Sequence, residues 1–243
     1  MPPARSAPRS PDRAMLVLFD IDGTLLHSLS AGIHAMSAAI RELHGADVDF
    51  ARVEVHGRLD TLIWRDLGRM HGFPTDDAEH ARFKECYSGH LERRLAERNT
   101  VEAMPGASAL VDAVCAMDGV TAGLLTGNYE RTGRLKVRHA GIDPDRFTVN
   151  AWGDDGPDRR SLVPVAMGRY HDRHGRAVDA RDVTIIGDTP HDVDCAHAAG
   201  ARVIAVATGK FGIDALREAG ADLAVADLRD TASLARWISR ADR

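Results

Sequence analysis

Cysteines and long hydrophobic runs are both scarce in this chain of 243 residues. The three cysteines, Cys86, Cys115 and Cys195, are odd in number and scattered. They therefore argue against a disulfide framework, show no metal-type spacing, and favour a reducing compartment. The longest early apolar run covers residues 15–19, which is too short for the core of a signal peptide or for a membrane span. We therefore expect a soluble, cytoplasmic protein.

An excess of positive charge is also missing. Lys and Arg together number 31 against 36 Asp and Glu, a net charge of −5, so we expect neither nucleic acid nor a membrane as a partner. The content of 44% hydrophobic and 28% charged residues excludes bulk disorder. Only residues 1–14, with four prolines and three arginines and no apolar period, predict a disordered leader.

Short apolar runs, most of them ending in polar residues, recur along the rest of the chain. They lie at 15–19, 120–125, 183–186, 202–207 and 222–226. Runs of this kind are typical of strands buried on both faces of a parallel sheet. Helical patterns separate them, at 107–116, 130–140, 162–171 and 191–199. The alternation predicts an α/β fold with a doubly wound parallel sheet.

Residues 28–100 interrupt this alternation. They contain no strand-like run, and their apolar residues recur at helical spacing, which fits two to four amphipathic helices. We predict a helical insert over 28–100, and a core made of 15–27 and 101–243. Within the insert Arg58, Asp60 and Trp64 are candidates to face a substrate, with packing or a surface ion pair as the alternative for each.

Two carboxylates follow the first strand. Asp20 and Asp22 lie two residues apart and project to the same side if the extended geometry continues. Ligands of such sheets bind beyond the carboxyl ends of the strands. Neighbouring carboxylates repel each other, so one tends to stay ionised as a nucleophile while the other takes up a proton as an acid. An ordinary Asp-Gly turn is the alternative.

Polar residues follow the second strand as well. Thr126, Gly127 and Asn128 offer a hydroxyl and main-chain N–H groups to an anion at the start of a helix; simple capping of that helix is the alternative. Further along, Arg159 and Arg160 precede a helix that Ser161 is expected to cap. A cation there would lie near the other strand ends, although surface arginines are usually solvated.

The last cluster runs from Gly187 to Asp192. Thr189 is expected to cap a helix whose first residue is Pro190. Asp192 is either part of that cap or a functional group. Asp188 would join Asp20 and Asp22 in an oxygen-rich site of the kind that suits Mg²⁺.

The order of these clusters closely resembles the haloacid dehalogenase-like hydrolase superfamily. Its four motifs match Asp20-Ile21-Asp22-Gly23-Thr24, Thr126, a basic residue, and Gly187-Asp188 with Asp192. Arg159 stands three residues before Leu162, like the Arg-x-x-Leu form of some members, and Arg160 is the alternative. The resemblance implies a Rossmann-like core and, at 28–100, the α-helical cap of the phosphoglycolate phosphatase-like branch.

The second aspartate of the first motif indicates the reaction. Haloacid dehalogenases lack it and phosphonatases carry Ala there, so Asp22 implies a phosphatase. The resemblance implies hydrolysis of a small phosphorylated metabolite with Mg²⁺. Asp20 would be the nucleophile that forms an aspartyl-phosphate, and Asp22 the acid and then the base. The other implied roles are phosphate binding by Thr126, Gly127, Asn128 and Arg159, metal binding by Asp20, the Asp22 carbonyl and Asp188, and orientation of Arg159 or a metal-bound water by Asp192.

Two other functions stay open. A sugar phosphomutase of the same superfamily shares both aspartates. A phospho-accepting signalling module, such as a response-regulator receiver domain, is also doubly wound and acidic. The length of the chain, the insert and the Gly-Asp-Thr-Pro-His-Asp cluster argue against the signalling module.

Residues 57–60 of the insert resemble the Gly-Arg-Thr-Asp segment of some capped members of the superfamily, except that Leu59 stands where those members have Thr. The sequence predicts no oligomeric state.

Overall fold

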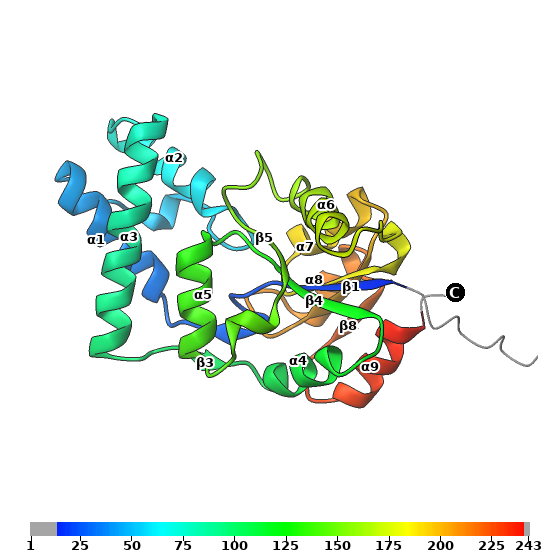
Figure 1. The fold of residues 1–243 in the computed structure, drawn as a ribbon. Helices are drawn as coiled ribbons and strands as arrows, with labels where there is room; N and C mark the ends of the chain where they lie inside the picture. Colours follow the sequence, from blue (N-terminus) through cyan, green and yellow to red (C-terminus); the bar gives the residue numbers. More distant parts are fainter. Residues whose placement is uncertain (1–13, 241–243) are drawn as a thin grey trace, which may run out of the picture.

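A six-stranded parallel sheet forms the centre of the protein (Figure 1). The computed structural model describes residues 14–240. The strand order is β5-β4-β1-β6-β7-β8. The strands are β1 (Met15–Phe19), β4 (Val120–Leu125), β5 (Val149–Ala151), β6 (Val183–Gly187), β7 (Arg202–Val206) and β8 (Leu223–Val225). Every pairing in this sheet is parallel, so the carboxyl ends of all six strands lie at one edge.

Both faces of the sheet are covered by helices. Successive side chains of a strand point to opposite faces, and in β1 Val17 and Phe19 join one apolar cluster while Leu16 and Leu18 join the other. The first cluster contains residues of α4 (Ala107–Cys115), α5 (Glu130–His139) and α9 (Thr231–Ser239). The second contains residues of α6 (Leu162–His174), α7 (Pro190–Ala198) and α8 (Ile213–Glu218). This burial on both faces explains why β1 is apolar without alternation.

The segment between β1 and α4 is mainly helical. Two short antiparallel strands, β2 (Leu26–His27) and β3 (Glu102–Ala103), connect it to the sheet. Beyond them lie α1 (Ala31–His44), α2 (Asp60–His71) and α3 (Asp77–Glu97), with a short 3₁₀ turn at Phe50–Arg52. Helix α1 packs against α3, and α3 also contacts α5 of the sheet domain. The three helices therefore form a lobe beside the carboxyl ends of the strands (Figure 1).

Several elements differ from the sequence expectations. Strand β5 was not predicted because Asn150 interrupts its apolar run; the Asn150 side chain accepts the Leu124 N–H and donates to the Phe147 carbonyl, which makes a polar residue acceptable inside the sheet. Helices α8 and α9 were also not predicted. Apart from Ala14, the predicted leader lies outside the described residues.

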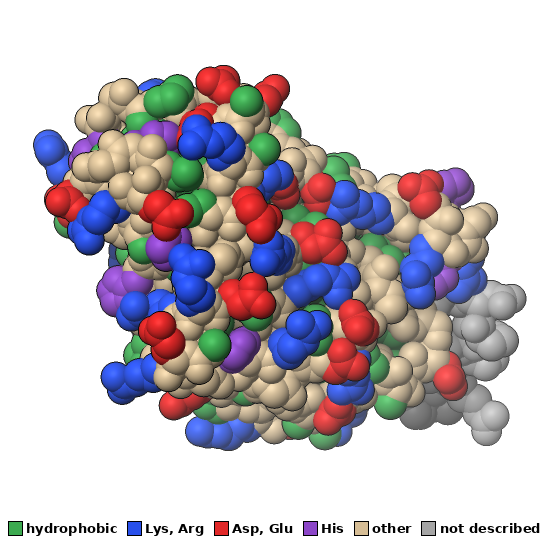
Figure 2. Space-filling model, turned by 60° about the vertical axis from the view of Figure 1, so that its left-hand side comes forward, with side chains coloured by type: hydrophobic (Ala, Val, Ile, Leu, Met, Phe, Trp, Pro, Cys, Tyr) green, Lys and Arg blue, Asp and Glu red, His purple; other side chains and the backbone are tan. Residues whose placement is uncertain are grey.

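The surface of the protein carries charges of both signs. Basic and acidic side chains alternate over the face shown in Figure 2, in keeping with their nearly equal numbers. Within residues 14–240, no helix combines the length and the apolar character needed to cross a membrane.

Candidate active site

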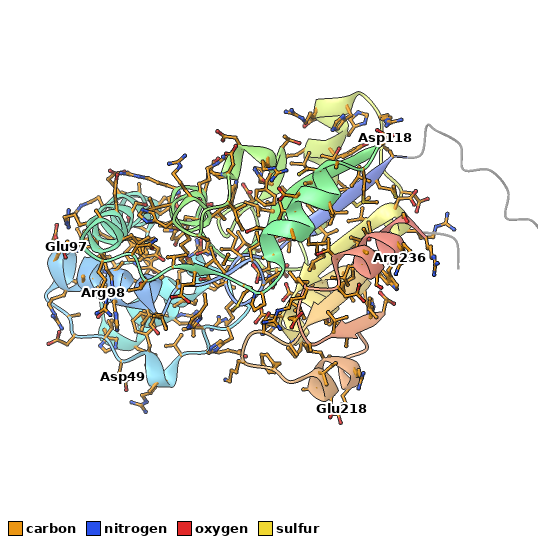
Figure 3. All side chains as sticks on the ribbon, turned by 90° about the horizontal axis from the view of Figure 1, so that it is seen from below. Asp49, Glu97, Arg98, Asp118, Glu218 and Arg236 are labelled. Carbon is orange, nitrogen blue, oxygen red and sulfur yellow. The ribbon has the colours of Figure 1, made fainter. Side chains whose placement is uncertain are left out.

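A cavity of about 340 Å³ lies between the carboxyl ends of the strands and the helical lobe. The sheet domain and the lobe both contribute lining residues, and side chains of both parts extend into the region where the two meet (Figure 3). Seven of the eight predicted site residues line the cavity: Asp20, Asp22, Thr126, Gly127, Asn128, Arg159 and Asp188. The eighth, Asp192, lies directly behind it. The structure therefore brings together residues that are far apart in the sequence.

Three buried carboxylates form the floor of the site. One oxygen each of Asp20, Asp188 and Asp192 lies within 4.8 Å of the others. Burial raises the pKa of Asp20 against the opposing effect of Arg159, and burial together with the charges of Asp20 and Asp192 raises the pKa of Asp188. The donor set contains only oxygen, and its three carboxylates outnumber the single neighbouring cation, Arg159, so it fits a hard divalent cation such as Mg²⁺.

Asp188 is enclosed by closely packed backbone. Gly23 has a φ of 83°, and a Cβ atom at Gly23 or Gly209 would overlap the Asp188 carboxylate. The Thr24 hydroxyl donates a hydrogen bond of 3.3 Å to Asp188 Oδ1. These loops hold the carboxylate in one orientation, which is what a metal ligand requires.

Asp192 caps a helix and also contacts a cation of the site. Its Oδ2 accepts the Thr189 N–H at 3.0 Å and the Thr189 hydroxyl at 2.7 Å, and together with the Asp192 N–H this completes a capping box at the start of α7. Its Oδ1 accepts a hydrogen bond from Arg159. The same side chain thus caps a helix and holds a cation.

Arg159, and not Arg160, reaches the acidic cluster. Arg159 is 7% exposed, lies 3.2 Å from Asp20 Oδ2, and donates to the Gly57 carbonyl of the lobe at 3.1 Å. Arg160 is 62% exposed and pairs with Asp194. Ser161 stands at the N-cap position of α6, as expected, but its side chain makes no capping hydrogen bond. Its hydroxyl instead donates to the Asp158 carbonyl in the preceding turn.

The two arginines provide a matched pair of variants. If Arg159 binds the phosphoryl group, as the family resemblance implies, Arg159→Ala should lower kcat/KM for a phosphate monoester by about 10²–10³-fold through loss of a buried donor. Arg160→Ala should stay within about twofold of the parent, since an exposed ion pair contributes little. Steady-state kinetics on both variants check this, and a severe loss in Arg160→Ala alone would move the role by one residue.

Asp22 is held by a cation that the sequence analysis missed. Lys136 Nζ donates to Asp22 Oδ2 at 2.7 Å, Asn128 Nδ2 donates to the same oxygen at 2.8 Å, and the Ser28 hydroxyl donates to Oδ1 at 3.1 Å. Burial raises the pKa of Asp22, but the Lys136 ammonium and these hydrogen bonds outweigh it and lower the pKa below its usual value. The pKa of Asp20 is therefore raised and that of Asp22 lowered. This order is opposite to the one expected for an ionised nucleophile at Asp20 and a protonated acid at Asp22.

The sequence did not indicate Lys136 as a site residue, because a lysine within a helix usually lies on the solvated face. In α5 it lies on the buried face with Thr132, Gly133 and Val137. This helical spacing is the sequence feature that could have indicated its burial.

The alternative of helix capping by Thr126 or Asn128 is wrong. Helix α5 begins at Glu130, with Tyr129 before it, so the polar loop precedes the helix.

The lobe contacts the loop of residues 126–128 through the start of α2. The Asp60 N–H donates to the Gly127 carbonyl at 2.8 Å, and a Cβ at Gly127 would overlap the Arg58 carbonyl. Asp60 lines the cavity, and burial raises its pKa to about 7 against the opposing charge of Lys136. Arg58 also lines the cavity but pairs with Asp66, and Trp64 stacks on His80 and Phe83 of α3.

Sequence comparison assigns the chain to a family. Residues 17–197 match the model of the haloacid dehalogenase-like hydrolases. The chain belongs to this family. A phosphoglycolate phosphatase of Rhodospirillum rubrum is 32% identical over 229 residues, covering 91% of this chain and 90% of that protein. Glycerol-1-phosphate phosphohydrolase 2 of Saccharomyces cerevisiae is 26% identical, covering 86% of this chain and 80% of that protein.

A solved structure confirms the fold of this family member. CbbY from Rhodobacter sphaeroides, in complex with phosphate, superposes with a TM-score of 0.68 at 18% identity, covering 89% of this chain and 96% of that one. The predicted α/β class and the phosphoglycolate phosphatase-like branch are confirmed, and the chain is a phosphatase of the hydrolase family.

Proposed function

We propose that this phosphatase hydrolyses a small phosphate monoester through an aspartyl-phosphate, with Mg²⁺ as cofactor. The observation that carries the proposal is the pairing of each aspartate with its own buried cation at one cavity: Asp20 with Arg159, and Asp22 with Lys136. The relatives named for phosphoglycolate and glycerol 1-phosphate support a substrate with two or three carbon atoms. A cavity of about 340 Å³ has room for such a substrate.

In the first step the Asp20 carboxylate attacks phosphorus in line. A bond from the Asp20 oxygen to phosphorus forms while the ester P–O bond breaks, and the leaving oxygen takes a proton from Asp22. The bound phosphate dianion raises the proton affinity of Asp22 and so opposes the effect of Lys136. Arg159, the Thr126 hydroxyl and the N–H of Gly127 or Asn128 bind the phosphoryl oxygens as charge develops on them.

In the second step a water molecule attacks phosphorus of the aspartyl-phosphate. The Asp22 carboxylate removes a proton from that water, the bond between phosphorus and Asp20 breaks, and inorganic phosphate leaves. Asp192 acts through Arg159, whose guanidinium it holds in place.

Asp20, the main-chain carbonyl of Asp22 and Asp188 would hold Mg²⁺. When bound, the ion neutralises part of the repulsion between the carboxylates and the phosphate. The three residues lie at the carboxyl ends of β1 and β6, and Asp20 and Asp188 belong to the buried acidic cluster.

Residues 28–100 act as the α-helical cap in this proposal, and residues 15–27 with 101–243 as the core. The start of α2 lies against Gly127 and Gly153, where the Thr61 hydroxyl donates to the Gly153 carbonyl at 2.9 Å. Contacts of this kind allow the cap to exclude water from the cavity and to surround the leaving group. The cytoplasmic location stays a prediction.

The metal requirement is tested directly. We expect phosphate release from glycerol phosphate or phosphoglycolate to fall to background after EDTA treatment and to return with added Mg²⁺, because three buried carboxylates without a cation repel the substrate. The assay measures free inorganic phosphate, with the product analysed for a transferred phosphoryl group. Undiminished hydrolysis in EDTA would refute the metal assignment. With a hexose phosphate as substrate instead, an isomeric hexose phosphate formed without free phosphate would favour the mutase.

A further inference from the structure

Lys136 is a buried cation that lies outside the four sequence motifs. Its side chain is only 5% exposed, and its ammonium donates to Asp22 Oδ2 and to Asn128 Oδ1, each at 2.7 Å. An ammonium group is costly to bury unless it is paired and hydrogen-bonded. The Asp22 side chain of this pair is 39% exposed, and such a partly buried ion pair adds little to stability. We therefore look for the role of Lys136 in how it positions the side chains of Asp22 and Asn128.

The two buried cations of the site serve different carboxylates. Arg159 contacts Asp20, Asp192 and the Gly57 carbonyl, which places it at the phosphoryl end. Lys136 contacts Asp22, the residue that handles the proton of the leaving group in the proposed reaction. Removing one cation or the other should therefore affect different parts of the same reaction.

The hydrogen bonds of Asp22 distinguish its two oxygens. Oδ2 accepts both Lys136 Nζ and Asn128 Nδ2, and these two donors are also bonded to each other through Asn128 Oδ1. Within residues 14–240, the one hydrogen bond that Oδ1 accepts comes from the Ser28 hydroxyl, at 3.1 Å, and a hydroxyl can rotate and accept as well as donate. The closed set of three hydrogen bonds fixes Oδ2, whereas Oδ1 keeps capacity for a further partner.

We propose that Lys136 is a positioning residue that holds Oδ2 of Asp22 and so assigns the proton transfer to Oδ1. This inference rests on the proposed phosphatase reaction. In the first step the proton on Oδ1 passes to the leaving oxygen as the ester bond breaks. In the second step Oδ1 accepts the proton of the attacking water. Without Lys136 the carboxylate is free to rotate, and both transfers lose their alignment.

The helical lobe limits the movement of Lys136. A Cβ atom at Gly32 of α1 would lie 3.3 Å from Lys136 Nζ and 3.2 Å from the Tyr87 hydroxyl of α3. These distances leave no free space between the ammonium and α1. The ammonium is thus confined between Asp22 and Asn128 on one side and the lobe on the other.

The test compares leaving groups. In Lys136→Met we expect kcat/KM for glycerol phosphate, whose alkoxide needs the proton, to fall about 10–100-fold more than that for p-nitrophenyl phosphate, whose phenolate leaves without it. Lys136→Arg, which keeps a donor, should recover part of the alkyl activity. Arg138→Met removes an exposed cation from the same helix and serves as the control; it should stay within about twofold for both esters.

The outcomes separate this inference from the proposed function. If the parent protein hydrolyses neither ester in Mg²⁺, the proposed function is wrong. If the parent hydrolyses both and Lys136→Met loses both by the same factor, only the positioning role is wrong. If Lys136→Met does not fold, Gly32→Ala is the second variant. Its added methyl group would lie 3.3 Å from Lys136 Nζ and displace the ammonium, while alanine favours the helix more than glycine does. A folded Gly32→Ala with an unchanged alkyl-to-aryl ratio would also overturn the proposal.

Discussion

An Asp20→Asn variant is expected to form no phosphoryl-enzyme from any monoester and to lose about 10⁴–10⁶-fold in kcat, as removal of a catalytic nucleophile typically does. The amide of asparagine is a poor nucleophile, and it also removes one negative charge from the acidic cluster that would hold Mg²⁺. Acid quenching of a reaction with ³²P-labelled ester, followed by counting of the precipitated protein, measures the intermediate.

Asp22→Asn is the matched comparison and should fail differently. It keeps the main-chain carbonyl but loses the acid and the base, so an alkyl phosphate should slow by about 10²–10⁴-fold. p-Nitrophenyl phosphate should still label Asp20, and the label should persist because no base activates the water. Label on Asp20→Asn, or equal loss of both esters at the transfer step in Asp22→Asn, would contradict this division of roles.

Asp192→Ala is expected to lower the free energy of unfolding by about 1–3 kcal/mol, the usual cost of leaving buried hydrogen-bond donors without their acceptor; Asp20 still partners the Arg159 charge. Asp192 is fully buried, holds Arg159, and completes the capping box at the start of α7. Urea unfolding followed by circular dichroism measures the change.

Asp192→Asn separates the two functions of the side chain. Its amide oxygen still accepts the Thr189 N–H, so the cap survives and the loss should be clearly smaller than in Asp192→Ala. A loss below about 1 kcal/mol in Asp192→Ala would mean that water or another group replaces both contacts.

The parts that the sequence predicted are those that local chemistry determines. β1 is apolar on both faces because both faces are buried, and Thr189-Pro190 starts a helix because the threonine caps and the proline fits the first turn. The acidic residues stand at strand ends, where a parallel sheet gathers them. A resemblance based on the order of these residues therefore indicated the fold and the family correctly.

The parts that the sequence did not predict depend on tertiary contacts. Asn150 is acceptable in a strand only because Leu124 and Phe147 supply its partners. Arg159 and Arg160 are adjacent in sequence, and the turn before α6 directs one inward and the other to solvent. Lys136 is explained only when Asp22 and Asn128 are seen at its ammonium.

The central place of β1 in the sheet has a consequence for folding during synthesis. Met15 pairs with Val120, and Leu16 pairs with Val183, so both edges of this early strand wait for partners made more than one hundred residues later. Pairings so distant in sequence are slow to form and leave an apolar strand uncovered in the nascent chain. The helices of the lobe, by contrast, are complete in sequence well before β6 is made. Translation thus produces Asp20 and Asp22 near the beginning, whereas β6, whose end places Asp188 beside Asp20, follows only in the last third of the chain.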